Sequence, residues 1–105
     1  MEDVIQLGGS VELSGFRDLE KINNAVINKI VGNYTSRYSD LSSNFEKLHL
    51  QLKKVHNTEK NYLIELHARA ISNGAVLTSK VEDRNLYFAL DKALKKIEAE
   101  MSRKR

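Results

Sequence analysis

The spacing of apolar residues changes along the chain, and it predicts first a strand and then a long helix. Residues 4–13 mix β-branched and aliphatic side chains around Gly8-Gly9, which predicts one strand with a bulge or kink. After Ser14, the expected N-cap, apolar residues recur at the spacing of one helix face. That face comprises Phe16, Leu19, Ile22, Val26, Ile30 and Tyr34, widened by Ile27 and Val31. The helix is expected to end at Gly32-Asn33 or to fray as far as Tyr38.

Farther along, apolar residues alternate with polar ones, as in strands that bury one face. A polar loop over residues 40–44 precedes the first of these runs, in which Leu48, Leu50 and Leu52 share a face. Two more strands are predicted over residues 62–71 and 75–81, joined by a tight hairpin turn at residues 72–74. Asp83 is expected to cap a last helix. The apolar face of that helix comprises Leu86, Ala89, Leu90, Ala93, Ile97 and Met101.

The predicted order of elements is therefore β-α-β-β-β-α, which belongs to the α+β class. Each helix has a single apolar stripe, so we expect both helices to pack side by side on one face of a four-stranded sheet. The first strand and the strand after the first helix should be parallel neighbours. With 105 residues, the chain has the size of a single domain, residues 1–105.

Composition narrows the classes of function. The chain has no cysteine, which excludes disulfides, thiolate catalysis and cysteine-based zinc sites. Its first residues are acidic where a secretion signal would be basic, and no apolar run reaches the length of a membrane span, so we expect a cytoplasmic protein that does not bind membranes. The sequence contains no glycine-rich phosphate loop and no nucleophile elbow. We therefore expect no enzymatic activity, no cofactor and no small-molecule substrate.

Three histidines, His49, His56 and His67, lie on or near neighbouring predicted strands. The alternation places His49 and His67 on the face opposite the leucines, where a metal site that includes Glu65 is one interpretation. Close pairs of ligands such as HxH or HExxH are absent, which favours neutral surface histidines. We therefore expect no metal site.

Charge is distributed unevenly along the chain. The net charge is +3, but residues 1–20 are net acidic and residues 84–105 are net basic. A concentration of cations of this kind attracts polyanions. On the last predicted helix, Lys92, Lys95, Lys96 and Ala99 form a continuous patch at i, i+3 and i+4 spacing. Phosphates could bind there, or the patch could be an ordinary solvated helix face.

The last helix also carries a pattern of residues that resembles a known family. It reads Asn85-Leu86-Tyr87-Phe88-Ala89-Leu90-Asp91-Lys92-Ala93-Leu94-Lys95-Lys96-Ile97-Glu98. This row resembles the last helix of the ribosome hibernation-promoting factors, also described as ribosome-associated translation inhibitors, in their short single-domain form. That helix has an acidic or amide residue, Met or Leu, Tyr, a free position, Ala, Ile or Leu, and Asp, followed by an Ala and a Lys-Leu or Lys-Ile step. The order of elements agrees with the family as well.

The resemblance implies a double-stranded-RNA-binding-domain-like fold and a non-catalytic RNA-binding module. Such a module would associate with the small ribosomal subunit, bind its ribosomal RNA and inhibit translation by occluding the decoding channel. We expect a monomer or a weak dimer. The expected RNA-binding residues are the cations of the two helices: Lys21, Lys29, Arg37, Lys92, Lys95, Lys96 and Arg103. Two stripes of cations are expected to flank the groove between the helices, although the first helix carries fewer cations than that family's members do.

Two further possibilities stay open at this point. The chain could be a protein-interaction module of the same fold, which uses an exposed sheet face or edge and binds no RNA. Tyr87 and Phe88 begin the last helix, and a base could stack on either ring if it were exposed, although at least one is expected in the core. Tyr34 and Tyr38 are expected to close one end of the core.

Overall fold

A computed structural model describes residues 4–7, 10–16, 23–57 and 62–103 of the chain. Their helices and strands are β1 (Val4–Leu7), β2 (Val11–Ser14), α1 (Asn24–Leu41), β3 (Phe45–Asn57), β4 (Tyr62–Ser72), β5 (Ala75–Asp83) and α2 (Leu86–Arg103). The elements from β2 to α2 follow the predicted β-α-β-β-β-α order. The predicted α+β fold class is confirmed.

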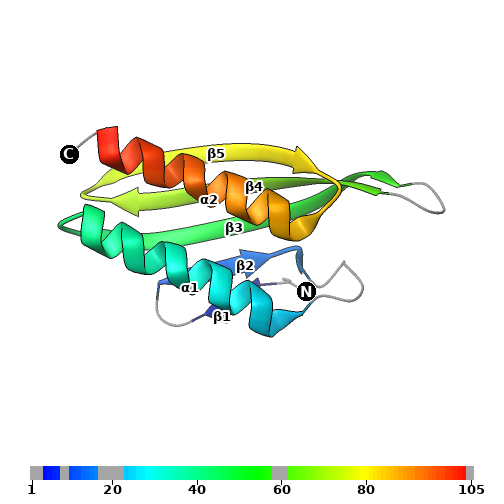
Figure 1. Cartoon of the computed structure of the whole chain (residues 1–105), viewed down its shortest axis with the longest axis horizontal. Helices are drawn as coiled ribbons and strands as arrows, with labels where there is room; N and C mark the ends of the chain where they lie inside the picture. Colours follow the sequence, from blue (N-terminus) through cyan, green and yellow to red (C-terminus); the bar gives the residue numbers. More distant parts are fainter. Residues whose placement is uncertain (1–3, 8–9, 17–22, 58–61, 104–105) are drawn as a thin grey trace.

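The strands form one mixed sheet in the order β1-β2-β3-β4-β5. β2 and β3 are parallel, with Val11 opposite Leu48, which confirms the predicted pairing. The β3, β4 and β5 strands form the predicted antiparallel meander. Both helices lie side by side on one face of this sheet, and no described element covers the other face (Figure 1). We call that second face the open sheet face.

The N-terminal segment forms two strands, so the prediction of one kinked strand is wrong. β1 and β2 pair in antiparallel fashion, with Val4 opposite Ser14 and Leu7 opposite Val11. A short fifth strand is thereby added to the four that were predicted. Gly8-Gly9, the expected bulge, lie outside the described residues. A run of apolar residues does not reveal a chain reversal, because both halves of a hairpin have the same composition and period.

The N-terminus of α1 differs from the prediction. The cap is Asn23, whose Oδ1 accepts hydrogen bonds from the backbone N–H groups of Ala25 (3.0 Å) and Val26 (3.2 Å). Ser14, the expected cap, is the last residue of β2, and its hydroxyl lies 3.1 Å from Nε2 of His49. Residues 17–22, the expected first turns of the helix, lie outside the described part of the chain.

The buried face of α1 is rotated from the predicted stripe. Its buried residues are Ile27, Val31, Tyr34 and Tyr38, whereas Val26 is exposed and Ile30 only partly buried. The helix also continues through Gly32 to Leu41. Glycine lowers helix propensity by about 1 kcal/mol, but tertiary packing of the apolar face supplies most of a helix's stability. The two tyrosines that follow Gly32 provide this packing.

The α2 helix buries the predicted stripe, together with Leu94. Its cap is Asn85, whose Oδ1 accepts a hydrogen bond from the backbone N–H of Phe88 at 3.0 Å. The prediction that Asp83 caps this helix is wrong, because Asp83 ends β5. Its Oδ1 accepts a hydrogen bond from the backbone N–H of Asn85 at 2.9 Å, so Asp83 orients the residue that forms the cap.

The core lies between the sheet and the helices. Leu48, Leu50 and Leu52 are buried, as predicted. Tyr38 is fully buried, and its hydroxyl donates a hydrogen bond to the backbone oxygen of Leu94 at 2.6 Å, which links α1 to α2. At the β4–β5 turn, Asn73 and Gly74 have φ angles of 52° and 77°, which confirms the predicted tight hairpin.

No helix in the described part of the chain combines the length and the hydropathy needed to cross a membrane.

Candidate nucleic-acid interface

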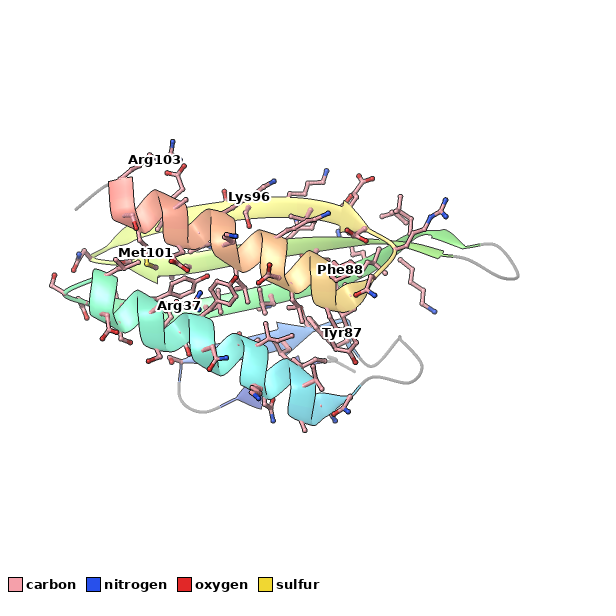
Figure 2. All side chains as sticks on the ribbon, in the orientation of Figure 1. Arg37, Tyr87, Phe88, Lys96, Met101 and Arg103 are labelled. Carbon is pink, nitrogen blue, oxygen red and sulfur yellow. The ribbon has the colours of Figure 1, made fainter. Side chains whose placement is uncertain are left out.

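The α2 helix has two chemically different sides. We call the side that contacts α1 the inner flank and define it by Tyr87, Asp91 and Glu98. We call the side next to β5 the outer flank and define it by Lys92, Lys96 and Arg103. Figure 2 shows Lys96 and Arg103 on the β5 side of the helix, and Arg37 of α1 on the opposite side, between the two helices.

The polar groups of the inner flank are bound to α1. The Tyr34 hydroxyl donates a hydrogen bond to Asp91 Oδ1 at 2.5 Å, and Arg37 Nη1 lies 3.3 Å from Glu98 Oε1. The Arg37 guanidinium also lies over the Tyr34 ring, 5.0 Å from its centroid. Burial and the hydrogen bond to Asp91 raise the pKa of Tyr34 to about 12, so the hydroxyl keeps its proton and donates it.

The groove between the helices therefore does not have two cationic walls. Its α2 wall carries the carboxylates of Asp91 and Glu98, which disfavour a phosphate, and Arg37 on the α1 wall lies beside Glu98 and over the Tyr34 ring. The prediction that cation stripes of both helices flank this groove is wrong on the α2 side. Helical spacing shows which residues share a side of a helix but not which neighbour that side contacts.

The outer flank faces an open groove against the edge strand β5. The groove has a volume of 380 Å³, and its lining residues are Thr78, Ser79, Lys80, Lys96, Ala99, Glu100 and Arg103. Lys80 of β5 also lines the groove, at the edge of the sheet, but strand alternation places its side chain on the open sheet face, where it pairs with Glu65. Thr78 and Ser79 line the groove as well, and the Ser79 hydroxyl donates a hydrogen bond to the backbone oxygen of Ala93.

Three cations around the groove have acidic neighbours. Arg103 pairs with Glu100, and Lys80 Nζ lies 3.5 Å from Glu65 Oε2. At the start of α2, Lys92 Nζ lies 2.9 Å from Asp83 Oδ2. The hydrogen bond from the Asn85 backbone, followed by that from Lys92, holds the pKa of Asp83 below its usual value. All three cations remain well exposed, and exposed pairs are weak enough to exchange for a phosphate.

Lys95 and Lys96 are exposed, and neither forms a salt bridge within the described residues. The structure thus brings together Lys92, Lys96 and Arg103 of the seven expected residues, with Lys95 nearby on the solvent side of α2. Lys29 is exposed on α1, Arg37 lies in the contact between the helices, and Lys21 lies outside the described residues.

Lys80 is the residue of this groove that the sequence analysis missed. Alternation along β5 predicts that Lys80 is exposed, because Leu77 and Val81 carry the buried side of the strand. The same pattern does not reveal that β5 is a sheet edge or that α2 packs beside it. That information comes from the strand order.

His49 and His67 lie on the open sheet face, as predicted. Nε2 of His67 contacts Glu65 Oε1, and this hydrogen bond lowers the pKa of Glu65. His49 is bonded to the Ser14 hydroxyl. Within the described residues there is no group of three or more potential metal ligands.

Comparison with known proteins yields a structural likeness. No family model matches the sequence, and no curated protein matches it. The crystal structure of the Thermus thermophilus Protein Y N-terminal domain is similar, with a TM-score of 0.57 and 21% sequence identity. The match covers 96% of this chain and 100% of that domain. At this identity the likeness establishes the fold alone.

Proposed function

We propose that this protein is a non-catalytic RNA-binding module that associates with the small ribosomal subunit in the cytoplasm and inhibits translation by occluding the decoding channel. Two arguments connect the chain to the ribosome. The row from Asn85 to Glu98 resembles the last helix of the hibernation factors. The fold is similar to that of the Protein Y N-terminal domain, a member of that family.

The observation that carries the RNA-binding part of the proposal is the outer flank of α2. Lys92, Lys96 and Arg103 lie on one side of the helix, and Lys80 adds a cation at the adjoining sheet edge. Contacts between such cations and phosphates release counterions and depend little on base sequence. A surface of this kind suits folded RNA, which is recognised largely by its shape and its phosphates.

The proposed inhibition needs no chemistry from the protein. A domain bound in the decoding channel would exclude messenger RNA and transfer RNA by volume alone. Its effect would therefore depend on occupancy, and so on affinity and protein concentration. Adding the purified protein to a reconstituted translation reaction should reduce initiation, and excess messenger and transfer RNA bound beforehand should protect the subunits.

The site can be tested by replacing Lys92, Lys95 and Lys96 together with glutamine. The logarithm of the affinity for small subunits falls with the logarithm of salt concentration, and each lost phosphate contact should reduce this slope by about 0.7 to 0.9. The variant should stay folded, because exposed substitutions usually change the free energy of unfolding by no more than about 0.5 kcal/mol. Cosedimentation with small subunits over a series of salt concentrations measures the slope.

A matched control removes the same amount of charge from the open sheet face. Lys47, Lys53 and Arg69 are exposed residues of β3 and β4, and all three can be replaced with glutamine. This control should keep the parent's salt slope. Equal losses in both variants would mean that only net charge matters, and the assigned site would be wrong. If the unmodified protein stays unbound to small subunits at low salt, the ribosomal function is wrong.

A protein-interaction module remains the second candidate function, and the open sheet face favours it. No described element covers this face, and β5 is an edge strand of the described sheet. An exposed edge can pair with a strand of another chain. Size-exclusion chromatography with light scattering distinguishes the two functions, because a stable dimer without affinity for RNA would favour this one.

A further inference from the structure

Phe88 is the most exposed of the large apolar side chains in the described part of the chain. It is 63% exposed, compared with 48% for Val76 and 41% for Val55. The neighbouring Tyr87 is partly buried against the core, and its hydroxyl accepts a hydrogen bond from the backbone N–H of Asn23 at 3.2 Å. The two rings at the start of α2 thus have different surroundings: Tyr87 contacts α1, and Phe88 faces solvent (Figure 2).

The position of Phe88 is fixed by the cap of α2. Its backbone N–H donates a hydrogen bond to Oδ1 of Asn85, whose own N–H is bonded to Asp83. The ring therefore projects from the capped first turn of the helix. A phenylalanine side chain also has only two rotatable angles, so little conformational freedom is lost when a partner covers the ring.

The ring lies on the same side of the helix as two cations. Lys92 follows Phe88 by four residues and Lys95 by seven, a spacing that places all three along one helix face. At 1.5 Å per residue, the two lysines stand about 6 Å and about 10 Å from Phe88 along the helix axis. Lysine side chains at these distances can reach phosphates of nucleotides adjacent to one that contacts the ring.

A single exposed apolar residue is common on protein surfaces, so exposure alone has little meaning. The combination of a fixed, exposed aromatic ring with neighbouring cations is characteristic of proteins that bind unpaired nucleotides, where bases stack on rings and cations follow the backbone. A protein partner would need apolar neighbours around the ring, but the next exposed positions are charged: Lys92, Lys95 and Asp91, of which Asp91 is bonded to Tyr34. The charge therefore favours a nucleic acid.

We infer that Phe88 stacks on an unpaired base of the bound RNA, while Lys92 and Lys95 contact the phosphates beside it. This inference rests on the proposed RNA-binding function and makes it more specific. It selects RNA that presents a single-stranded or bulged nucleotide over a continuous duplex, in which every base is covered by its neighbours.

The absence of tryptophan from the chain allows a direct test. The Phe88→Trp variant has one tryptophan, whose fluorescence should be quenched when a base stacks on it. The probes are a single-stranded RNA, a duplex with one bulged base, and a fully paired duplex with the same number of phosphates. We expect quenching by the first two and little by the third. Val76→Trp places the same reporter at an exposed position of β5 on the open sheet face, and it should not respond.

The affinity of substituted proteins gives the second measurement. Removal of a stacked ring by Phe88→Ala should weaken binding to the bulged RNA by roughly ten- to hundredfold, whereas Phe88→Tyr, which keeps a ring, should bind like the parent. Affinity for the fully paired duplex should not change. The salt slope should also stay the same, because no charge is removed.

Three results would overturn the inference. If Phe88→Ala binds the bulged RNA as tightly as the parent does, while the lysine variants lose affinity, the stacking role is wrong and the RNA-binding surface stands. If Phe88→Ala binds RNA normally but loses affinity for intact subunits, the ring contacts a ribosomal protein. If the unmodified protein binds neither RNA nor subunits, the proposed function fails together with this inference.

Discussion

The two flanks of α2 carry polar residues in similar numbers but use them differently. On the inner flank, Asp91 and Glu98 accept hydrogen bonds from Tyr34 and Arg37 of the neighbouring helix. On the outer flank, Lys96 forms no salt bridge within the described residues, and Lys92 and Arg103 form exposed pairs with Asp83 and Glu100. The difference shows that one helix can use carboxylates on one side to bind its neighbour and present exposed cations to a ligand on the other.

The largest effect should come from the contact between the helices. In Tyr38→Phe, the backbone oxygen of Leu94 loses the buried hydrogen bond from the hydroxyl and keeps its bond within α2, which should reduce the free energy of unfolding by about 0.5 to 1.5 kcal/mol. RNA binding by the folded variant should be unchanged. Urea unfolding measures the loss, and Tyr87→Phe is the matched control, because its partner, Asn23, is exposed to water. A control that loses as much stability as Tyr38→Phe would contradict this assignment.

A smaller effect should distinguish a cation of the outer flank from a cation of the groove between the helices by the salt dependence of RNA binding. Lys96→Gln on the outer flank should reduce the salt slope of RNA binding by about 0.7 to 0.9. Arg37→Gln removes the same charge from the groove between the helices, where the carboxylates of Asp91 and Glu98 disfavour a phosphate, and should leave the slope nearly unchanged. Equal changes in the two slopes would show that the flanks do not differ toward RNA.

The smallest effect should be the contribution of Asp83 to stability at low pH. The pKa of Asp83 is lowered in the folded protein, mainly by the hydrogen bond from the Asn85 backbone and also by Lys92. This contribution to stability is therefore present above the ordinary pKa of 3.8 and is lost as the pH falls through the lower folded-state value. Unfolding measured at a series of pH values should show a shallower loss of stability below pH 3.8 for Asp83→Asn than for the parent. Parallel curves would mean that Asp83 contributes nothing.

Much of the fold could be predicted from the sequence, because the spacing of apolar residues indicates which side of a helix or strand faces the core. The leucines of β3 and the stripe of α2 illustrate this. The predictions were wrong where a contact between distant residues determines where a helix begins. Ser14 and Asn23 are both good capping residues, but Ser14 lies in β2 opposite Gln51, which places it in the sheet before the helix begins.

Less of the candidate site could be predicted from the sequence. Helical spacing places Lys92, Lys96 and Arg103 on one side of α2, but only the packed structure shows that this side faces β5. Lys80 joins them because β5 is an edge strand of the described sheet. The pairing of Arg37 with Glu98 links residues 61 positions apart, and no local pattern reports such a contact.

The parallel pairing of β2 with β3 also bears on the order in which the chain folds. Ser72 and Ala75 pair across a two-residue turn, whereas Val11 reaches Leu48 only after the chain has passed through the whole of α1. Closing a long loop costs entropy before its contacts form, so such pairings tend to come late. In pulse-labelled refolding, the amides of β4 should become protected before those of β2. Because α2 packs on β4 and β5, the surface that we assign to RNA should assemble before the N-terminal hairpin docks.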